Sequence, residues 1–428
     1  MYGVIAELYP ICRSITGDGL RQTLRRIAEL IPLELHEVAS GTQAFDWVVP
    51  KEWNIRDAYV KNSRGERVID FAKSNLHVLN YSVPVRGTFT LDELKEHLYS
   101  LPDRPRWIPY RTSYYQERWG FCVSHEQLEQ LQPDRYEVCI DSTLGPGHLT
   151  YGEYVLPGES EDEILISCHS CHPSLCNDNL SGIVVAAFLA REMSSRPRKH
   201  TFRFLFVPGT IGSIVWLARN RQRAQRVRHG LVLTCVGDSG RPSYKRSRRG
   251  DALIDRAAQH VLGHAGDHEI IEFFPYGYDE RQYCSPGFNL AVGALSRTPG
   301  GRFPEYHTSA DNLELVQPQA LEQSLATCLD ICQVLEGNGV YRNTNPFCEP
   351  QLGKRGLYQG LGSQGSLPGF ELAMLWVLNL SDGAHALLDI AERAKMSFRV
   401  IRQAADALER AGLLAPAAES SRPQHDRS

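Results

Sequence analysis

Three cysteines, two histidines and an aspartate lie within the sixteen residues Ser167 to Gly182, which read SCHSCHPSLCNDNLSG. Thiolates, imidazoles and carboxylates are the side chains that bind transition metals in proteins. The spacing alone fits a haem attachment motif, half of a zinc knuckle, a redox pair or one edge of a hydrolytic metal site. The elements on either side of this segment separate these alternatives.

A strand precedes the segment and a helix follows it. The apolar, β-branched run DEILISCH, residues 162–169, predicts a buried strand. The run DNLSGIVVAAFLAREMSSR predicts an amphipathic helix that starts at Asp178 and Asn179. The segment is therefore a strand-to-helix loop, where open α/β sheets usually bind ligands. This position disfavours covalent haem and favours a metal site.

The thiols of this loop are expected to be packing residues. A thiolate zinc knuckle needs a second closely spaced pair of cysteines, and no later Cys-x-x-Cys is present. Cys328 and Cys332 fall at helical i,i+4 spacing inside an amphipathic stretch. We therefore expect Cys168, Cys171 and Cys176 to fill space, and His169 to line the site from the end of the strand.

Polar residues also follow other predicted strands, in the segments CVGDSG, YDERQYCSPG and PEYHTSADN. Together with the first loop they offer two imidazoles and two carboxylates as ligands, His172, Asp178, Asp238 and His307. This donor set suits Zn²⁺ with an open position for water, and a shared carboxylate would suit two ions. We expect one or two zinc ions here, with Glu280 as a further acidic side chain.

Composition excludes other classes of function. The 428 residues are 42% hydrophobic and carry a formal net charge of -4, which gives no overall attraction to nucleic acid or anionic lipid. The N-terminus lacks the pattern of a signal peptide, and no apolar run reaches the ~20 residues of a membrane span. With eleven scattered cysteines, we expect a cytoplasmic protein with reduced thiols and no membrane partner.

The order of strands and helices predicts an α/β fold with a mainly parallel sheet flanked by helices. Apolar residues from Tyr2 to about Leu30 recur at helical spacing and predict a first amphipathic helix. We expect four parts: an α/β domain over 1–44 and 139–345, an inserted small β-rich α+β domain over 45–138, a linker and winged-helix domain over 346–415, and a disordered tail over 416–428.

The C-terminal part predicts three helices, the last two separated by the turn Lys395-Met396-Ser397, as in a winged helix. Acidic residues offset the arginines of its last helix: Arg399, Arg402, Arg410, Asp406 and Glu409. This balance favours packing or protein contacts over reading of DNA bases. A homo-oligomer could form through the winged-helix or the inserted domain.

The order of site residues resembles the zinc aminopeptidase superfamily that includes the leucyl aminopeptidases. The shared pattern is a His, then Asp-Asn-x-Ser-Gly at the start of a helix, a later Asp and a late Tyr-His-Thr. YPICRSITGDGLRQTL, DERQYCSPG and EPQLGKRGLY are similar to a bacterial aminopeptidase-like group. In that group a domain of unknown function interrupts the peptidase domain and a winged helix follows it. The resemblance covers nearly the whole chain.

The resemblance implies a zinc-exopeptidase-like fold and a role for each ligand. His172 and Asp238 would bind one ion, His307 would bind the other, and Asp178 would bridge them. The substrate would be a small-molecule or peptide-like amide with a free amine beside the bond, cleaved by an aminopeptidase, amidase or deacylase. The group also suggests a step in polysaccharide or secondary-metabolite biosynthesis.

Three positions depart from the superfamily pattern. Ser174 replaces the aspartate that usually orients the first histidine. Gly209, in VPGTIGS, stands where the related group keeps a glutamate and the superfamily has its general base. Asp279-Glu280-Arg281 stands where many relatives have Asp-His. Glu280 is therefore our expected proton acceptor, unless it forms a salt bridge with Arg281.

Substrate contacts are expected from Arg281, which could hold a carboxylate or phosphate, and from Tyr283 and Tyr306 as walls of the site. Two other functions stay open at this stage. Gly209 would fit a binding module that has lost turnover, and the C-terminal helices would fit a DNA-binding regulator with an α/β sensor domain.

Overall fold

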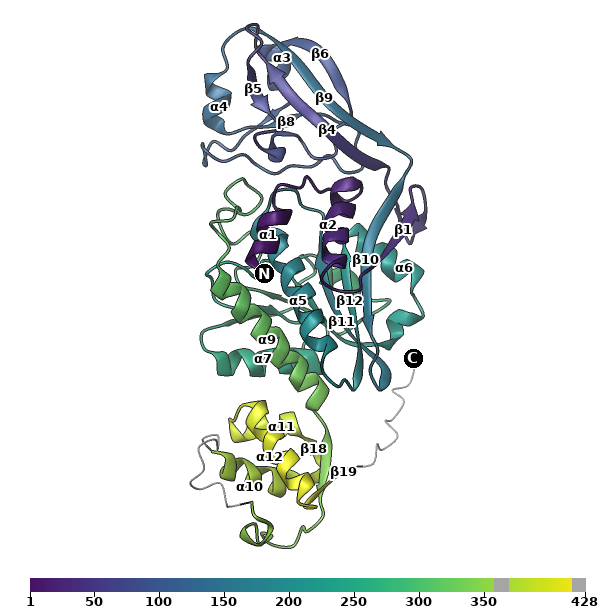
Figure 1. Cartoon of the computed structure of the whole chain (residues 1–428), viewed down its shortest axis with the longest axis vertical. Helices are drawn as coiled ribbons and strands as arrows, with labels where there is room; N and C mark the ends of the chain where they lie inside the picture. Colours follow the sequence, from purple (N-terminus) through teal and green to yellow (C-terminus); the bar gives the residue numbers. More distant parts are fainter. Residues whose placement is uncertain (358–368, 418–428) are drawn as a thin grey trace. The chain divides into compact units, whose positions relative to one another are not determined.

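The protein is described by a computed structural model that covers residues 1–357 and 369–417 (Figure 1). The middle of the expected linker and nearly all of the expected tail lie outside the described residues. Two compact units are present: one contains residues 1–255 and 267–328, and the other contains 256–266 and the chain from 329 onward. Among the described helices, none combines the length and the apolar character that a bilayer span requires.

The first unit is built on an eight-stranded sheet with the order β1-β10-β12-β11-β13-β16-β14-β15. The strands are β1 Glu34–Ala39, β10 His148–Leu156, β12 His200–Val207, β11 Ser160–His169, β13 Val227–Leu233, β16 Val292–Ser296, β14 Ser243–Lys245 and β15 Glu269–Ile271. The four central strands from β12 to β16 run parallel, and β1, β10 and β14 pair antiparallel with their neighbours. The expected α/β fold is confirmed, with antiparallel pairs toward both edges.

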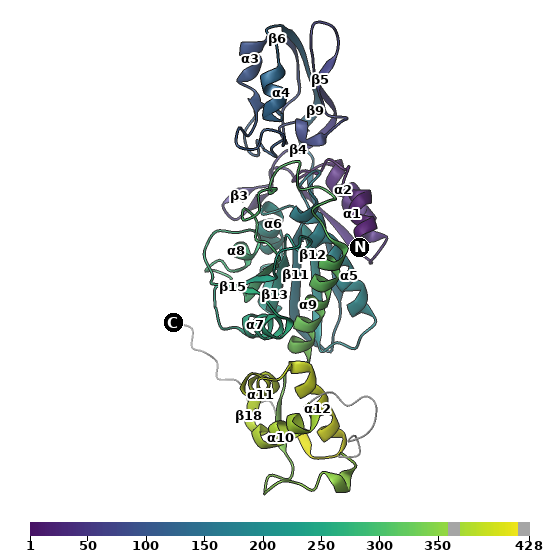
Figure 2. The same cartoon turned by 90° about the vertical axis from the view of Figure 1, so that its left-hand side faces the viewer.

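Helices cover both faces of this sheet (Figure 2). Within the first unit these helices include α5 Gly182–Ser194, α6 Ile211–Arg219 and α8 Glu280–Tyr283. Helix α9 Pro318–Gly337 begins in the first unit, and α7 Leu253–Ala265 belongs mostly to the second. Helix α5 lies on one face, and α6 and α8 lie on the other. Nine of the thirteen residues of α5 are buried, as expected for the crossover between two central parallel strands.

The N-terminal segment differs from the expected single helix. It forms two helices, α1 Tyr2–Leu8 and α2 Asp18–Ala28, with an irregular stretch between them. Pro10 has no backbone N–H to continue the first helix. Gly17, before α2, has a φ of 94°. The intervening stretch places Arg13, whose guanidinium donates to the carbonyl oxygens of His172 and Pro173.

The inserted segment forms a second sheet with the order β5-β4-β9-β6. Its strands are β4 Glu52–Lys61, β5 Arg67–Asp70, β6 Val85–Thr90 and β9 Arg135–Gly145, with helices α3 Leu91–Lys95 and α4 His125–Gln130. Short pairs complete it: β2 Gln43–Ala44 with β3 Trp47–Val48, and β7 Leu98–Tyr99 with β8 Phe121–Cys122. Capping boxes start α3 at Thr90 and α4 at Ser124.

The second unit contains the winged helix. Helices α10 Phe370–Leu380, α11 Leu387–Ala394 and α12 Phe398–Arg410 accompany a three-stranded sheet of β17 Val340–Asn343, β18 Asp382–Ala386 and β19 Leu414–Pro416. The turn between α11 and α12 is Lys395 to Ser397, as the sequence predicts. The expected winged-helix architecture is therefore confirmed.

Candidate metal centre

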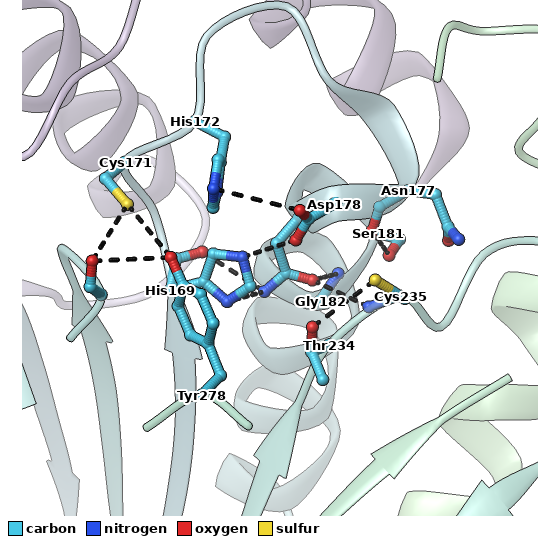
Figure 3. Close-up of polar contacts among 12 residues, drawn as sticks. His169, Cys171, His172, Asn177, Asp178, Ser181, Gly182, Thr234, Cys235 and Tyr278 are labelled. Carbon is cyan, nitrogen blue, oxygen red and sulfur yellow. Dashed lines mark hydrogen bonds and ion pairs between the residues drawn. The ribbon is translucent and has the colours of Figure 1, made fainter. Parts of the chain in front are cut away.

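The side chains of His169 and His172 lie beside Asp178 at the carboxyl end of β11 (Figure 3), and His307 reaches the same carboxylate. His169 is the last residue of β11, and Asp178 lies in the irregular turn Cys176–Ser181 that leads into α5. The Nε2 atoms of His169 and His307 are 2.7 Å from Oδ1 and 3.0 Å from Oδ2 of Asp178. The Nε2 atom of His172 is 3.9 Å from the same Oδ2 atom. Two sequence-distant segments, around residues 170 and 307, thus converge on one carboxylate.

His172 has the least hydrogen bonding of the three histidines. Its side chain is buried, and its Nδ1 atom has no hydrogen-bond partner among the described residues. Burial lowers the pKa of His172 well below its usual range, so the ring is neutral at pH 7 and keeps a lone pair. A buried imidazole with a free lone pair beside a carboxylate is the arrangement that a bound cation would complete.

His169 has a different role from His172, because hydrogen bonds fix its tautomer. The Nδ2 amide group of Asn179 lies 3.3 Å from Nδ1 of His169, and the Oδ1 atom of Asn179 accepts from the backbone N–H of Gly182 and Cys235. The Nδ1 atom of His169 therefore faces an amide nitrogen that cannot accept a hydrogen bond, which favours the tautomer with the proton on Nε2. His169 donates that proton to Asp178 and thereby orients the carboxylate. Its Nε2 atom has no lone pair available for a cation.

Asp178 is ionised. Burial raises its pKa, but the interactions with His172, His169 and His307, including hydrogen bonds from His169 and His307, outweigh burial and hold the pKa of Asp178 well below its ordinary value. The side chains of His169, His172 and Asp178 are all buried, and their ligand atoms lie within 4.8 Å of one another. The side chain of His307 is 34% exposed, so the cluster opens toward solvent on that side.

A second buried acid, Asp311, holds the turn that carries Asp178. Its carboxylate accepts backbone N–H bonds from Cys176 (3.1 Å), Asn177 (2.6 Å) and Asp178 (2.9 Å). Burial raises the pKa of Asp311 to about 7, against the effect of these donors. The sequence analysis did not assign this residue a function, although it follows His307 by four positions in PEYHTSADN.

Asp238, expected as a ligand, lies outside the cluster and is saturated with hydrogen bonds. Its Oδ2 atom accepts from Asn177 Nδ2 at 2.8 Å, and its Oδ1 atom accepts from Thr298 Oγ1 at 2.7 Å. The backbone N–H groups of Gly240 and Thr298 donate to it as well. In this arrangement Asp238 fixes Asn177, the residue before Asp178.

Tyr278 fills the space that Gly209 leaves open. A Cβ atom added to Gly209 would lie 2.0 Å from Cε1 of Tyr278, so no larger residue fits there while the ring stays in place. The same ring packs on His169 with 3.9 Å between ring centroids. The Tyr278 hydroxyl lies 3.5 Å from the carbonyl oxygen of Gly209 and 3.7 Å from Cys171 Sγ. Burial raises the pKa of Tyr278 well above its usual range, so it is a neutral phenol.

Glu280, expected as the proton acceptor, has a structural partner instead. Its buried carboxylate accepts from Lys245 Nζ at 2.9 Å and from the backbone N–H of Tyr278. The ion pair is thus with Lys245, not with Arg281 as the sequence suggested. Arg281 has a buried Nε atom without a hydrogen-bond partner among the described residues. Glu280 therefore fixes the loop that carries Tyr278.

The two tyrosines expected as walls of the site have different positions. Tyr306 stacks on His307 with 4.0 Å between ring centroids, which agrees with the expected position. Tyr283 is fully buried, and its hydroxyl lies 2.9 Å from Ser167 Oγ. Its expected contact with substrate is therefore not met, because its ring belongs to the hydrophobic core.

The thiols near the cluster are buried and protonated. Burial raises the pKa of Cys171 to about 12, and it raises those of Cys168 and Cys176 well above the usual range. Each of the eleven cysteines is free of disulfide bonds. These observations agree with the expectation that the thiols of the loop pack rather than bind a metal.

Comparison with known proteins places this site in a family. Residues 2–338 match the family described as a domain of unknown function, DUF4910, and residues 339–416 match a winged helix-turn-helix family. The chain belongs to the DUF4910 family. It is 54% identical over 415 residues to a Clostridium acetobutylicum protein that is named for polysaccharide biosynthesis and an aminopeptidase-like domain. That alignment covers 97% of this chain and 95% of the relative.

Solved structures agree with this assignment. A crystal structure of a protein from Clostridium acetobutylicum that is named as a peptidase has a TM-score of 0.92, with 53% identity over 97% of this chain and 95% of that chain. A zinc aminopeptidase from Bacillus subtilis has a TM-score of 0.55, with 14% identity over 78% of this chain and 93% of that chain. The aminopeptidase-like fold of this DUF4910 chain is therefore confirmed, as is its C-terminal winged helix.

Proposed function

We propose that this DUF4910 chain is a zinc-dependent hydrolase that cleaves an amide bond beside a free amine. His172, Asp178 and His307 would hold one ion. The observation that carries this proposal is His172, a buried neutral imidazole whose Nδ1 atom has no partner among the described residues and whose Nε2 atom lies 3.9 Å from the ionised carboxylate of Asp178. The relatedness of the fold to zinc aminopeptidases supports the choice of zinc.

The donor set fits zinc. Ligand atoms about 2.0–2.1 Å from a tetrahedral ion lie roughly 3.3 Å from one another. The separations of 3.0 Å and 3.9 Å between Asp178 Oδ2 and the Nε2 atoms of His307 and His172 lie on either side of that value. The 2.7 Å contact from His169 is shorter and is a direct hydrogen bond. His169 is thus proposed as a positioning residue.

When bound, zinc would polarise the substrate carbonyl and lower the pKa of a bound water. The chain's own side chains do the rest. His169 and Asp311 hold Asp178 in one orientation from two sides, so little reorganisation accompanies binding. Tyr278 contributes a neutral hydroxyl within the same group of side chains and no carboxylate base. The carboxylates of Asp178 and Glu280 already have partners. Asp279, next to Tyr278 in the chain, is buried and accepts from Ser213 Oγ at 2.7 Å through Oδ1, while its Oδ2 atom has no hydrogen-bond partner among the described residues.

The first test is metal binding by the purified chain. We expect elemental analysis to find about one zinc ion per chain, and added zinc to raise the Tm of metal-stripped protein. His172→Ala and His307→Ala should lose the ion, whereas His169→Gln, which retains a donor toward Asp178, should keep it. A wild-type chain that neither contains zinc nor gains stability from it would disprove the proposal.

One observation favours a second candidate, a metal-bound binding module without turnover. The Tyr278 ring occupies the space beside Gly209, where the related group has a glutamate side chain, so position 209 itself offers no carboxylate. A screen of aminoacyl-anilides and N-acyl sugars with zinc present separates the two candidates. Turnover that depends on His172 supports the hydrolase, and metal binding with no turnover in the whole screen supports the module.

We further propose that the reaction belongs to polysaccharide or secondary-metabolite biosynthesis, as the name of the Clostridium acetobutylicum relative suggests for that protein. The winged helix would then serve protein contacts. Arg402 on α12 donates to Asp406 and to the hydroxyl of Tyr341, so this arginine is engaged within its own domain. Light scattering would detect a homo-oligomer, and a gel shift at physiological salt would detect the alternative, DNA binding.

A further inference from the structure

A polar cavity of about 350 Å³ lies beside His307, and the inserted segment forms most of its lining. The lining residues used below are Tyr110, Arg111, Ser113, Gln116, Arg118 and His307. None of the described residues that line the cavity is acidic. The cavity is therefore positively charged at its rim and rich in hydrogen-bond donors.

The segment that lines this cavity is fixed at both ends. Tyr110 N–H donates to the carbonyl oxygen of His307 at 2.8 Å, and Ser309 N–H donates to that of Ile108 at 2.8 Å. On the other side, Ser113 N–H donates to the carbonyl oxygen of Asn80 at 2.9 Å. Ordered backbone on both sides means that a ligand would not have to immobilise this segment.

Two cations at the cavity have no acidic partner. The Arg111 and Arg118 side chains are exposed, and no described carboxylate forms an ion pair with either of them. Glu117, the acid between them in this segment, is paired with Lys51 at 2.6 Å. Unpaired guanidinium groups, with five donors each, match carboxylate and phosphate oxygens.

Tyr110 connects the cavity to the histidine cluster. Its ring centroid lies 5.2 Å from that of His172 and 5.1 Å from that of His307, edge-to-face in both cases. His307 therefore has one side on the cavity and its Nε2 atom on Asp178. A molecule that binds in the cavity would lie next to the proposed zinc ligands.

We propose that this cavity is a substrate subsite in which Arg111 and Arg118 bind an anionic group of the substrate, a carboxylate or a phosphate. The inserted domain would thus select acidic amide substrates for the centre formed by the α/β domain. The assignment rests on the proposed function, because it takes the histidine cluster as the place of reaction. It gives the role of anion recognition to Arg111 and Arg118 rather than to Arg281.

Anion binding to metal-stripped protein tests the subsite without any need for turnover. We would titrate the full chain with inorganic phosphate and with succinate in separate calorimetric experiments, with succinamide as the uncharged counterpart. We expect at least one of the two anions to bind and succinamide not to bind. Arg111→Ala/Arg118→Ala should weaken that binding by roughly ten- to hundred-fold, because charge-assisted hydrogen bonds are lost.

The matched control is Arg86→Ala/Arg135→Ala, which removes the same charge from strands β6 and β9 of the inserted domain. Neither residue lines the cavity. This variant should bind the anion as the wild type does. Absence of binding by both anions, or equal loss in both double variants, would overturn the subsite. Preference for phosphate or for succinate identifies the anionic group.

The same preparations separate this proposal from the proposed function. Arg111→Ala/Arg118→Ala should bind zinc normally, since neither arginine is in the proposed ligand set. Zinc binding without anion binding would overturn the subsite alone, and anion binding without zinc binding would overturn the metal centre alone. Equal Tm values for the metal-stripped double variant and wild type would show that the loss of anion binding is not a loss of fold.

Discussion

The candidate site has two sides that differ in character: the turn that carries Asp178, here called the first side, and the wall formed by Gly209 and Tyr278, here called the second side. The turn that carries Asp178 is saturated: Asp311 accepts three of its backbone N–H groups, and His169 and His307 occupy the two carboxylate oxygens. The facing wall consists of Gly209 and the Tyr278 ring, where the related group has a glutamate. One side of the site therefore consists of charge and hydrogen bonds, and the other side consists of aromatic volume packed against a glycine.

This contrast indicates which functions tolerate the departure at Gly209. A cation needs donors and a fixed carboxylate, and the first side provides both. Proton transfer needs a free base, and Gly209 and the Tyr278 ring provide none, because burial raises the pKa of the Tyr278 phenol. The comparison therefore predicts large effects on metal binding from the first side and effects on packing from the second.

The largest expected effect comes from Asp178→Asn. Removing the charge that the histidines surround should weaken zinc binding by more than about 100-fold, beyond the effect expected for a supporting residue. Isothermal titration with zinc measures this. The matched control is Asp238→Asn, whose parent carboxylate faces Asn177 and Thr298, and we expect it to keep zinc within about ten-fold. An equal loss in both variants would make Asp238 a ligand after all.

Gly209→Glu breaks the second side. Because the new side chain would overlap the Tyr278 ring, we expect a loss of about 1–3 kcal/mol in the free energy of unfolding, measured with urea. Combining it with Tyr278→Ala should recover much of that loss by vacating the space. If the single variant were as stable as wild type, the packing between Gly209 and Tyr278 would not contribute to the free energy of unfolding.

Asp311→Asn tests whether the hydrogen bonds that hold the turn also support zinc binding. An amide has only one oxygen to accept the three backbone N–H groups of the turn, so we expect about 1–3 kcal/mol less stability and weaker zinc binding. Asp92→Asn, at an exposed acid on α3, serves as the control and should change stability by less than about 0.5 kcal/mol. If Asp311→Asn bound zinc with wild-type affinity, the hydrogen bonds of the turn would not contribute to zinc binding.

The smallest effect is expected for Tyr283→Phe. Loss of the hydroxyl contact with Ser167 should cost about 1 kcal/mol of stability and leave zinc binding and any turnover unchanged. Thermal unfolding and the same zinc titration measure both. A change in substrate affinity without a change in stability would show that Tyr283 contacts the substrate after all.

Periodicity and the resemblance were sufficient to predict the α/β sheet, the inserted β-rich segment and the winged helix, since these follow from local patterns of apolar residues. They also predicted that His172, Asp178 and His307 share one region, because strand ends meet at one edge of a sheet. Contacts between side chains were not accessible in this way. The partners of Asp238 and Glu280 depend on Thr298 and Lys245, which no local pattern connects to them.

Residues outside the recognised motifs were missed for the same reason. Tyr110 reaches the cluster because residues 108–110 of the insertion pair with residues 307–309, a contact between segments about two hundred positions apart. His169 was expected only to line the site, and its role as a donor to Asp178 depends on Asn179. Tyr278 directly precedes a recognised motif, but its role in filling the space beside Gly209 could not be predicted without the contact between the two residues.

The three hydrogen bonds from the turn to Asp311 also bear on the order of events during synthesis. Residues 176–178 leave the ribosome more than a hundred residues before Asp311, and the turn lacks its anchor until the later segment has docked. Cation capture should therefore be a late step in maturation. Nascent chains arrested before residue 311 should fail to retain zinc even when the helix after Asp178 has formed.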